Sequence, residues 1–185
     1  SDLLVMTLAP DRDGNKRQVT IQLMPPPFSQ GWIGNIRKLA AAHWWDGLAI
    51  TRVQDNYVVQ WGDPDAEDKA KAKPSPAGLV TAPESGYTSP VPPPTRDARG
   101  APAVGFPGVR DAYAPSSGVT LTGWPVGSDG TKWWPVHCYG MVGVGRNYSP
   151  DTGSGAELYT VIGHAPRHLD RNIALVGRVV EGIEH

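Results

Sequence analysis

The stretch that decides the fold is LAITRVQDNYVVQWGD, residues 48–63. Its β-branched and aromatic residues predict two short strands, over 48–53 and 57–61. Gln54-Asp55-Asn56 separates them, and these polar side chains can bond their own backbone in a turn. The stretch is therefore interpreted as a β-hairpin.

Two long polar side chains interrupt the apolar pattern of this hairpin. Because side chains alternate along a strand, we expect Arg52 to share a face with Ile50 and Leu48, and Gln60 to share a face with Val58. An arginine is costly to bury without a partner. Arg52 is therefore either an edge-strand residue whose guanidinium reaches water or a residue with a chemical role.

The order of residue types here resembles the signature segment of the cyclophilin-type peptidyl-prolyl isomerases. That segment stands in this chain as Ile50-Thr51-Arg52, Tyr57-Val58-Val59-Gln60 and Gly62-Asp63. The resemblance implies that Arg52 and Gln60 are the catalytic pair at the site that holds the proline of a peptide. Gln60 would orient the guanidinium or the substrate carbonyl.

The run from Tyr139 to Gly145 is similar to the family's strand that ends in Met-Ala-Asn-x-Gly. Val142 stands for the alanine and Gly143 for the asparagine that usually contacts the peptide. The missing asparagine side chain would weaken one hydrogen bond, and we expect the backbone edge at Gly143 and Val144 to stay available to the peptide.

Two later segments extend the resemblance. Residues 156–159 match the family's Ser-Gln-Phe-Phe strand, with Glu157 for the glutamine and Tyr159 for a pocket phenylalanine. Residues 168–179 match Trp-Leu-Asp-Gly and the strand after it, with His168 for the tryptophan and Ile173 for the pocket histidine. The resemblance implies that the substrate-binding residues are Tyr57, Val58, Gly143, Val144, Glu157, Tyr159, His168 and Leu169.

The fold class follows from the other periodic segments. Residues 3–8 and 17–23 are predicted strands, and 29–43 carries apolar residues at helical spacing. Strands, a helix and more strands predict a mainly β chain, a closed antiparallel cyclophilin-like β-barrel with helices capping its ends. We expect residues 1–185 to form a single domain.

Residues 64–118 hold most of the prolines together with many small and charged residues. Their weak hydrophobic periodicity predicts a long, partly ordered insertion in the cyclophilin-like pattern. We expect that 69–112 can be deleted without loss of the fold, because the entropy of loop closure grows slowly with length. The family's closing helix and last strand have no counterpart before His185, so we expect the C-terminal end to be incomplete.

Composition narrows the possible partners. The formal net charge is -1, which gives no reason to expect nucleic acid as a partner, and no apolar run reaches transmembrane length. Cys138 is the single cysteine, so the chain cannot form an internal disulfide. We expect a monomer that acts on proline-containing peptides or unfolded clients without cofactor or metal. The chain starts without a leader, which fits a cytosolic protein or a secreted one whose signal is removed; of the two we expect a periplasmic or secreted protein.

The sequence thus predicts a peptidyl-prolyl cis-trans isomerase that assists protein folding. The alternative is a non-catalytic proline-peptide binding module or chaperone on the same scaffold, which the departures at Gly143, His168 and Ile173 favour.

Two other site types find weaker support. Asp151-Thr152-Gly153 is the aspartic-protease tripeptide, but that site needs an apolar strand before the aspartate and a second carboxylate. Asn147 to Pro150 precedes it instead, which favours a surface loop. His137 and Cys138 are adjacent, a spacing that favours neither zinc nor a Cys-His nucleophile.

Overall fold

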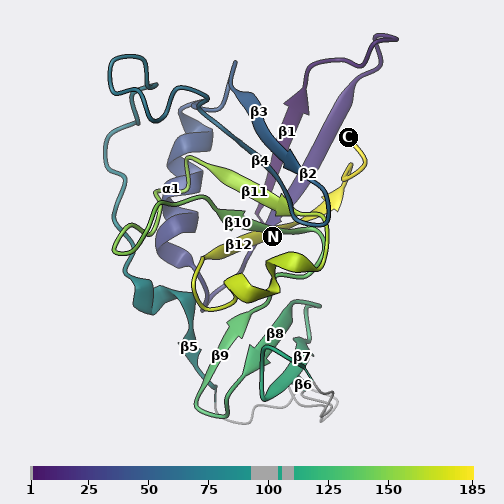
Figure 1. Ribbon diagram of the computed structural model, residues 1–185, viewed down its shortest axis with the longest axis vertical. Helices are drawn as coiled ribbons and strands as arrows, with labels where there is room; N and C mark the ends of the chain where they lie inside the picture. The colour runs from purple at the N-terminus through teal and green to yellow at the C-terminus, as the bar shows by residue number, and fades with distance from the viewer. Residues whose placement is uncertain (1, 93–103, 106–110) are drawn as a thin grey trace.

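The computed structural model describes residues 2–92, 104–105 and 111–185. The main element of the described chain is a strongly curled seven-stranded sheet, a half-barrel in which every neighbouring pair is antiparallel. Figure 1 shows this sheet above a second, smaller sheet, with the α-helix along its side. The strand order is β1-β2-β12-β10-β11-β4-β3.

The strands of the large sheet lie close to where the sequence predicts them. Their bounds are β1 Leu3–Leu8, β2 Arg17–Leu23, β3 Ala49–Gln54, β4 Val58–Gly62, β10 Met141–Val144, β11 Leu158–Val161 and β12 Leu175–Glu181. In β2 the alternation of Val19, Ile21 and Leu23 places all three side chains in the core.

The predicted closed barrel is a half-barrel in the structure. β1 pairs with β2 and β3 pairs with β4, and in the described part of the chain neither of these edge strands pairs with the other. Within the same residues there is one α-helix, α1 Gln30–Ala41, together with two short 3₁₀ helices, η1 Glu84–Tyr87 and η2 Ala165–Leu169. The sheet is therefore covered by α1, η2 and loops instead of being capped at both ends by helices.

Helix α1 packs an apolar stripe into the core. Trp32, Ile33, Ile36 and Leu39 recur at helical spacing, and each is at most 1% exposed. The indole Nε1 of Trp32 donates to the carbonyl oxygens of Thr152 and Gly153. These contacts tie the helix to the loop before β11, so α1 fixes one side of the curled sheet.

The second sheet has the order β5-β9-β8-β7-β6. Its strands are β5 Ser89–Pro90, β6 Val104–Gly105, β7 Ser116–Thr120, β8 Pro125–Ser128 and β9 Lys132–Pro135. The predicted insertion ends near residue 118, and residues on both sides of that position form strands of this sheet. The described part of the insertion therefore shares a sheet with the residues that follow it.

Part of the predicted insertion also belongs to the main core. Ala82 is 3% and Tyr87 6% exposed, and the Tyr87 ring stacks on Trp32 at 5.5 Å between centroids. Asn35 exchanges hydrogen bonds with the backbone of Val80. The expectation that 69–112 can be removed without harm is wrong for this part, while 93–103 and 106–110 lie outside the described residues.

No helix in the described ranges combines the length and apolar character needed to cross a membrane.

Candidate functional site

A β-bulge in β3 sets the direction of Arg52. Ile50 lies opposite Trp61, but Arg52 lies opposite Gln60, so one extra residue, Thr51, is accommodated between them. Bulges bend a strand and re-aim its side chains. The expectation that Arg52 shares a face with Ile50 is therefore wrong, because the extra residue moves Arg52 to the face of Gln60.

This register places three of the predicted residues in one row across the sheet. Arg52 lies opposite Gln60, and Gln60 lies opposite Tyr159. Directly opposite residues of an antiparallel pair project from the same face. Arg52 and Tyr159 thus share a face only two strands apart, although 106 residues lie between them in the sequence.

Next to this row, Tyr57 lies between a guanidinium and an imidazole. The Arg52 Cζ is 5.3 Å from the centroid of the Tyr57 ring, within the range of a cation–π contact. The rings of Tyr57 and His168 stack at 5.9 Å with an interplanar angle of 9°. The sheet and η2 therefore meet at Tyr57, and the two predicted residues Tyr57 and His168 lie together.

The hairpin turn before Tyr57 holds η2 in this position. Asn56 has a left-handed φ of 54°, which asparagine tolerates better than most residues. Its side-chain oxygen accepts the backbone N–H of His164, and its carbonyl accepts that of Ala165. A Cβ on Gly163 would lie 2.3 Å from the Asn56 carbonyl carbon, so the close approach requires glycine there.

Gln60 and Glu157 form a polar pair beside Arg52. Gln60 Nε2 donates to Glu157 Oε1, while the Arg52 Nη2 donates to Gln54 Oε1. Gln60 thus holds Glu157 and not the guanidinium, contrary to one of the two roles expected for it. The Glu157 side chain occupies space over Gly145, where an added Cβ would lie 2.8 Å from Glu157 Cγ.

Val58 and Tyr159 lie beneath this surface. They are 2% and 4% exposed, so they form a covered floor and not an open pocket. The Tyr159 ring crosses β10 at Gly143, because a Cβ there would lie 2.3 Å from both Tyr159 Cζ and Oη. The glycine at the family's asparagine position therefore accommodates the tyrosine at the family's phenylalanine position.

β10 is an interior strand of the large sheet. Gly143 pairs with Tyr159 of β11 on one side and, next to a register shift, with Leu175 of β12 on the other. Val144 is fully buried and its N–H donates to the Ala174 carbonyl. A peptide therefore cannot add to β10 as a further strand, and a contact with the backbone of these two residues stays a prediction.

A buried polar chain leads away from Tyr159. The His137 Nε2 lies 2.8 Å from the Tyr159 hydroxyl, and the His137 Nδ1 lies 2.9 Å from Asp170 Oδ1. Asp170 Oδ2 accepts from Arg167 Nε at 3.0 Å, and Arg167 Nη2 pairs with Asp111 at 2.6 Å. Burial lowers the pKa of His137 against the opposing pull of Asp170, and burial raises the pKa of Tyr159 well above its ordinary value.

A comparison of the chain with models of protein families identifies its family. The model described as "Cyclophilin type peptidyl-prolyl cis-trans isomerase/CLD" matches residues 15–185. The chain belongs to this family. Membership in the cyclophilin family supports peptidyl-prolyl isomerase activity, as the sequence predicts.

A solved structure agrees with the fold. The crystal structure of the cyclophilin AquaCyp293 from Hirschia baltica superposes with a TM-score of 0.64 at 20% identity, covering 97% of this chain and 68% of that one. At this identity the likeness establishes the cyclophilin fold alone. Comparison with curated proteins finds none that matches.

The residues that the cyclophilin resemblance singles out lie at different depths in the structure. Arg52, Tyr57, Gln60, Glu157 and His168 lie around one surface region, whereas Val58 and Tyr159 form its floor and Val144 points into the core. Leu169 is half-buried at the end of η2. Sequence reasoning missed His137 and Asp170, although His137 is among the residues weighed as metal ligands.

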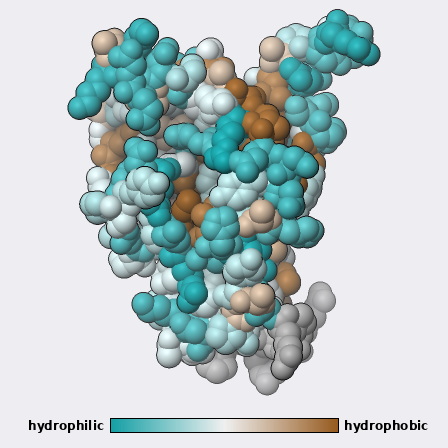
Figure 2. Space-filling view, viewed as in Figure 1, coloured by the Kyte–Doolittle hydropathy of each residue, from teal (hydrophilic) through white to brown (hydrophobic). Residues whose placement is uncertain are grey.

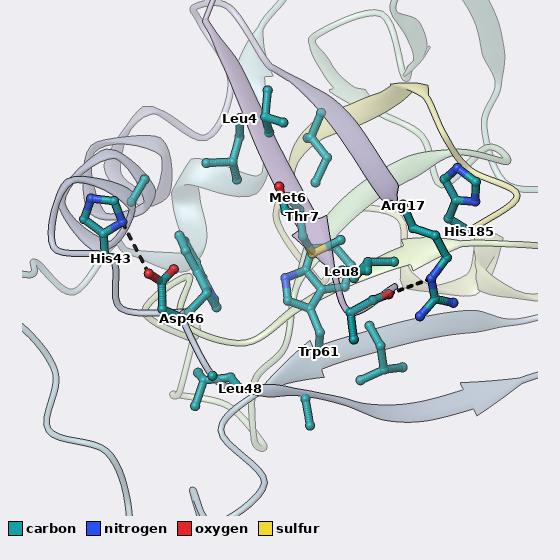
Figure 3. A pocket seen from close by; sticks show the side chains of 18 residues that line it. Leu4, Met6, Thr7, Leu8, Arg17, His43, Asp46, Leu48, Trp61 and His185 are labelled. Atoms are coloured by element: carbon teal, nitrogen blue, oxygen red, sulfur yellow. Dashed lines mark hydrogen bonds and ion pairs between the residues drawn. The ribbon is translucent and has the colours of Figure 1, made fainter. Parts of the chain in front are cut away.

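A large cleft lies elsewhere on the molecule. It has a volume of about 840 Å³ and is bordered by β1, β3 and the residues after α1. Figure 2 shows hydrophobic residues gathered where β1 and β3 face each other. Figure 3 shows Leu4, Met6, Leu8 and Trp61 toward the cleft, with His43 and Asp46 at one side. The cleft is the open side of the half-barrel. Its lining includes Ile50 and Trp61, which lie beside Arg52 and Gln60 on the same two strands but on the other face of the sheet.

The structure also bears on the aspartic-protease tripeptide and on a metal site. Asp151 lies in an exposed loop, where its carboxylate accepts backbone N–H groups of Asn147 and Gly153, so it caps a turn and does not follow an apolar strand. Across the described ranges, no group of three or more His, Cys, Asp or Glu side chains is arranged to hold a metal ion.

Proposed function

We propose that this cyclophilin-type protein isomerises X–Pro peptide bonds on the surface formed by Arg52, Gln60, Tyr57 and His168. The observation that carries the proposal is the row in which the bulge of β3 brings Arg52 to the face of Gln60 and Tyr159. Tyr57 and the floor residues beneath it supply apolar contact for a proline ring. In this proposal the protein acts as a monomer, without cofactor, on proline-containing segments of unfolded clients.

The chemistry requires no nucleophile or metal. Rotation about an X–Pro bond is opposed by amide resonance, with a barrier of ~18–20 kcal/mol. At the twisted transition state the proline nitrogen becomes pyramidal and regains a lone pair. A guanidinium N–H of Arg52 can donate to this lone pair, which exists only in the transition state, so the interaction lowers the barrier selectively.

Arg52 has donors left for this role. A guanidinium carries five N–H groups, and the hydrogen bond from Arg52 to Gln54 uses only one of its nitrogens. The contact with Tyr57 keeps the group beside the expected proline ring. Lowering the barrier by roughly 7 kcal/mol would speed rotation about 10⁵-fold.

Gln60 and Glu157 would hold the peptide backbone next to the proline. The Gln60 amide donates one N–H to Glu157, and an amide has a second N–H and a carbonyl oxygen for the substrate. Glu157 carries a negative charge where the cyclophilin pattern has a neutral glutamine. It can accept backbone N–H groups of the peptide but cannot donate to its carbonyls.

A second candidate is a binding module that holds proline segments without catalysis. The burial of Val58 and Tyr159 favours this function, because a proline ring cannot enter as deeply here as it would in an open pocket. The stack of half-buried Tyr57 and exposed His168 would still offer an aromatic surface to a proline ring.

The two functions are separated by NMR exchange measurements of cis–trans rates on a short Ala-Pro peptide. We expect the wild type to accelerate exchange and Arg52→Ala to lose most of the acceleration. The control is Arg12→Ala, which removes an arginine whose side chain is 93% exposed in the distant β1–β2 connection. If the wild type binds the peptide but leaves the exchange rate unchanged, the binding module is the correct function.

A further inference from the structure

The buried histidine outside the predicted site connects two parts of that site. His137 is fully buried in the connection between β9 and β10. One of its ring nitrogens faces Tyr159, on the floor of the site. The other faces Asp170, the residue that follows η2, and η2 carries His168 and Leu169.

The bonding partners determine which nitrogen carries the proton. Asp170 Oδ1 also accepts the backbone N–H of His137 at 2.8 Å, and Asp170 Oδ2 accepts from Arg167. A carboxylate with two such donors is an acceptor, so the His137 Nδ1 is the one that carries hydrogen. The Nε2 is then a bare lone pair, and the Tyr159 hydroxyl donates to it.

This arrangement fixes the Tyr159 ring. The hydroxyl is drawn past β10 toward His137, and the ring lies across Gly143 with no room for a Cβ. The two rings are nearly parallel, at 13° and 6.1 Å between centroids. The aromatic face therefore stays under the Arg52–Gln60 row and the polar hydroxyl is kept away from it.

We propose that His137 is a positioning residue for the peptide site, linking the Tyr159 floor to the η2 wall through one imidazole. The proposal rests on the proposed function for its effect on peptides, but the link itself is a property of the fold. His137 touches no substrate. It acts by holding Tyr159 on one side and Asp170, and with it His168, on the other.

Protonation of His137 would reverse the link at a defined atom. A second proton goes to Nε2, which then becomes a donor, and the Tyr159 hydroxyl has to accept where it donated before. The charged or titratable groups around His137 are Asp170, Arg167, His168, Tyr159, Cys138 and Asp111. Arg167 and His168 disfavour the added charge and Asp170 favours it.

Glutamine offers a test because its amide keeps one donor and one acceptor but cannot be protonated. In His137→Gln the amide N–H can donate to Asp170 while its oxygen accepts from Tyr159. The matched control is His43→Gln, the same change beside an aspartate at an exposed position, where the histidine side chain is 79% exposed.

The measurement is the dissociation constant of a short Ala-Pro peptide at pH 7.5, with catalysis recorded in parallel. Because burial lowers the pKa of His137, the folded protein keeps this imidazole neutral at that pH. We expect His137→Ala to weaken the affinity about three- to tenfold, the value of one hydrogen bond, while His137→Gln and His43→Gln stay close to the wild type. Losses of the same size in His137→Gln and His137→Ala, or no loss in either, would overturn the proposal.

Imidazole ¹⁵N signals test the link independently of activity. In the wild type we expect the His137 Nδ1 to show a protonated nitrogen and the Nε2 an unprotonated one, and Tyr159→Phe should shift the Nε2 alone. A protonated Nε2 at neutral pH would contradict the proposal. If the wild type shows the expected tautomer and binding yet no isomerisation, the proposed function fails while the positioning role stands.

Discussion

At the scale of single residues, Gly143 and Tyr159 form a matched pair. The chain lacks the asparagine that the cyclophilin pattern places at position 143, and the structure gives the reason. The Tyr159 ring occupies the space that any side chain at position 143 would need. The departure noted in the sequence is therefore an adaptation to the larger aromatic residue.

Gly143→Ala should destabilise the protein by about 1–3 kcal/mol, the usual cost of overpacking a core. In a chain that already carries Tyr159→Val, Gly143→Ala should cost less, since the clash is then absent. The control is Gly34→Ala in α1, where a Cβ meets nothing within 4 Å and helix propensity predicts a gain of about 1 kcal/mol. Urea unfolding measures all three. Equal effects of the two alanine substitutions would show that the Tyr159 contact is not tight.

Sequence reasoning succeeded at residues whose types are local signals. The resemblance to the cyclophilin segment predicted that Arg52, Tyr57 and Gln60 lie together, and they do, while their role in a peptide site stays a prediction. It failed on the direction of Arg52, because alternation assumes a regular strand and the extra residue at Thr51 leaves no mark in the residue types. It could not link His137 to Asp170, since that contact joins positions 33 apart through the packing of η2.

At the scale of elements, the segment around η1 is the largest revision. Its proline-rich composition indicates an excursion, yet Tyr87 and Ala82 complete the core beside α1. Two apolar side chains in a polar segment are too weak a pattern to predict burial. Their position follows from long-range contacts with Trp32 and Thr152 instead.

Tyr87 should respond differently to two substitutions. Tyr87→Ala should cost about 3–5 kcal/mol, as for other buried aromatic residues. Tyr87→Phe should be neutral or stabilising, because the hydroxyl is buried without a hydrogen-bond partner among the described residues, and such a group pays a desolvation penalty. Thermal unfolding of both variants measures this. A large loss in Tyr87→Phe would reveal a partner for the hydroxyl.

At the scale of the whole molecule, the half-barrel leaves two edges unpaired in the described chain, β1 and β3, on either side of an apolar cleft. Residue patterns predicted the strands well, because each strand carries its own apolar face. Closure could not be predicted from them, since it depends on whether the two edges meet. The row of Arg52, Gln60 and Tyr159 spans the edge strand β3 and its neighbours β4 and β11, and these pairings do not require closure.

The stability of the whole fold should depend on the protonation of His137. Burial lowers the pKa of His137 from its ordinary 6.5, so below that value the unfolded chain binds a proton that the folded chain excludes. The free energy of unfolding should therefore reach its full value above pH 6.5 and fall as the pH is lowered. The loss is up to about 1.4 kcal/mol for each pH unit between the pKa of His137 in the unfolded chain and its pKa in the folded chain.

Urea unfolding between pH 7.5 and 5 tests this, with His137→Gln to remove the titration and His43→Gln to control for exposed histidines. The wild type and His43→Gln should lose more stability on acidification than His137→Gln. Parallel curves for all three proteins would show that the histidine titrates equally in the folded and unfolded chains.

The catalytic role of Arg52 is tested by comparing isomerisation and binding in Arg52→Lys. Lysine keeps the positive charge but lacks the planar fork that can reach the proline nitrogen while another donor stays bonded. Because the lone pair appears only in the transition state, the loss should fall on turnover and leave the affinity for an Ala-Pro peptide nearly unchanged. NMR exchange gives the rates and titration gives the affinities. Arg52→Lys that isomerises as fast as the wild type would contradict the role of Arg52 in catalysis.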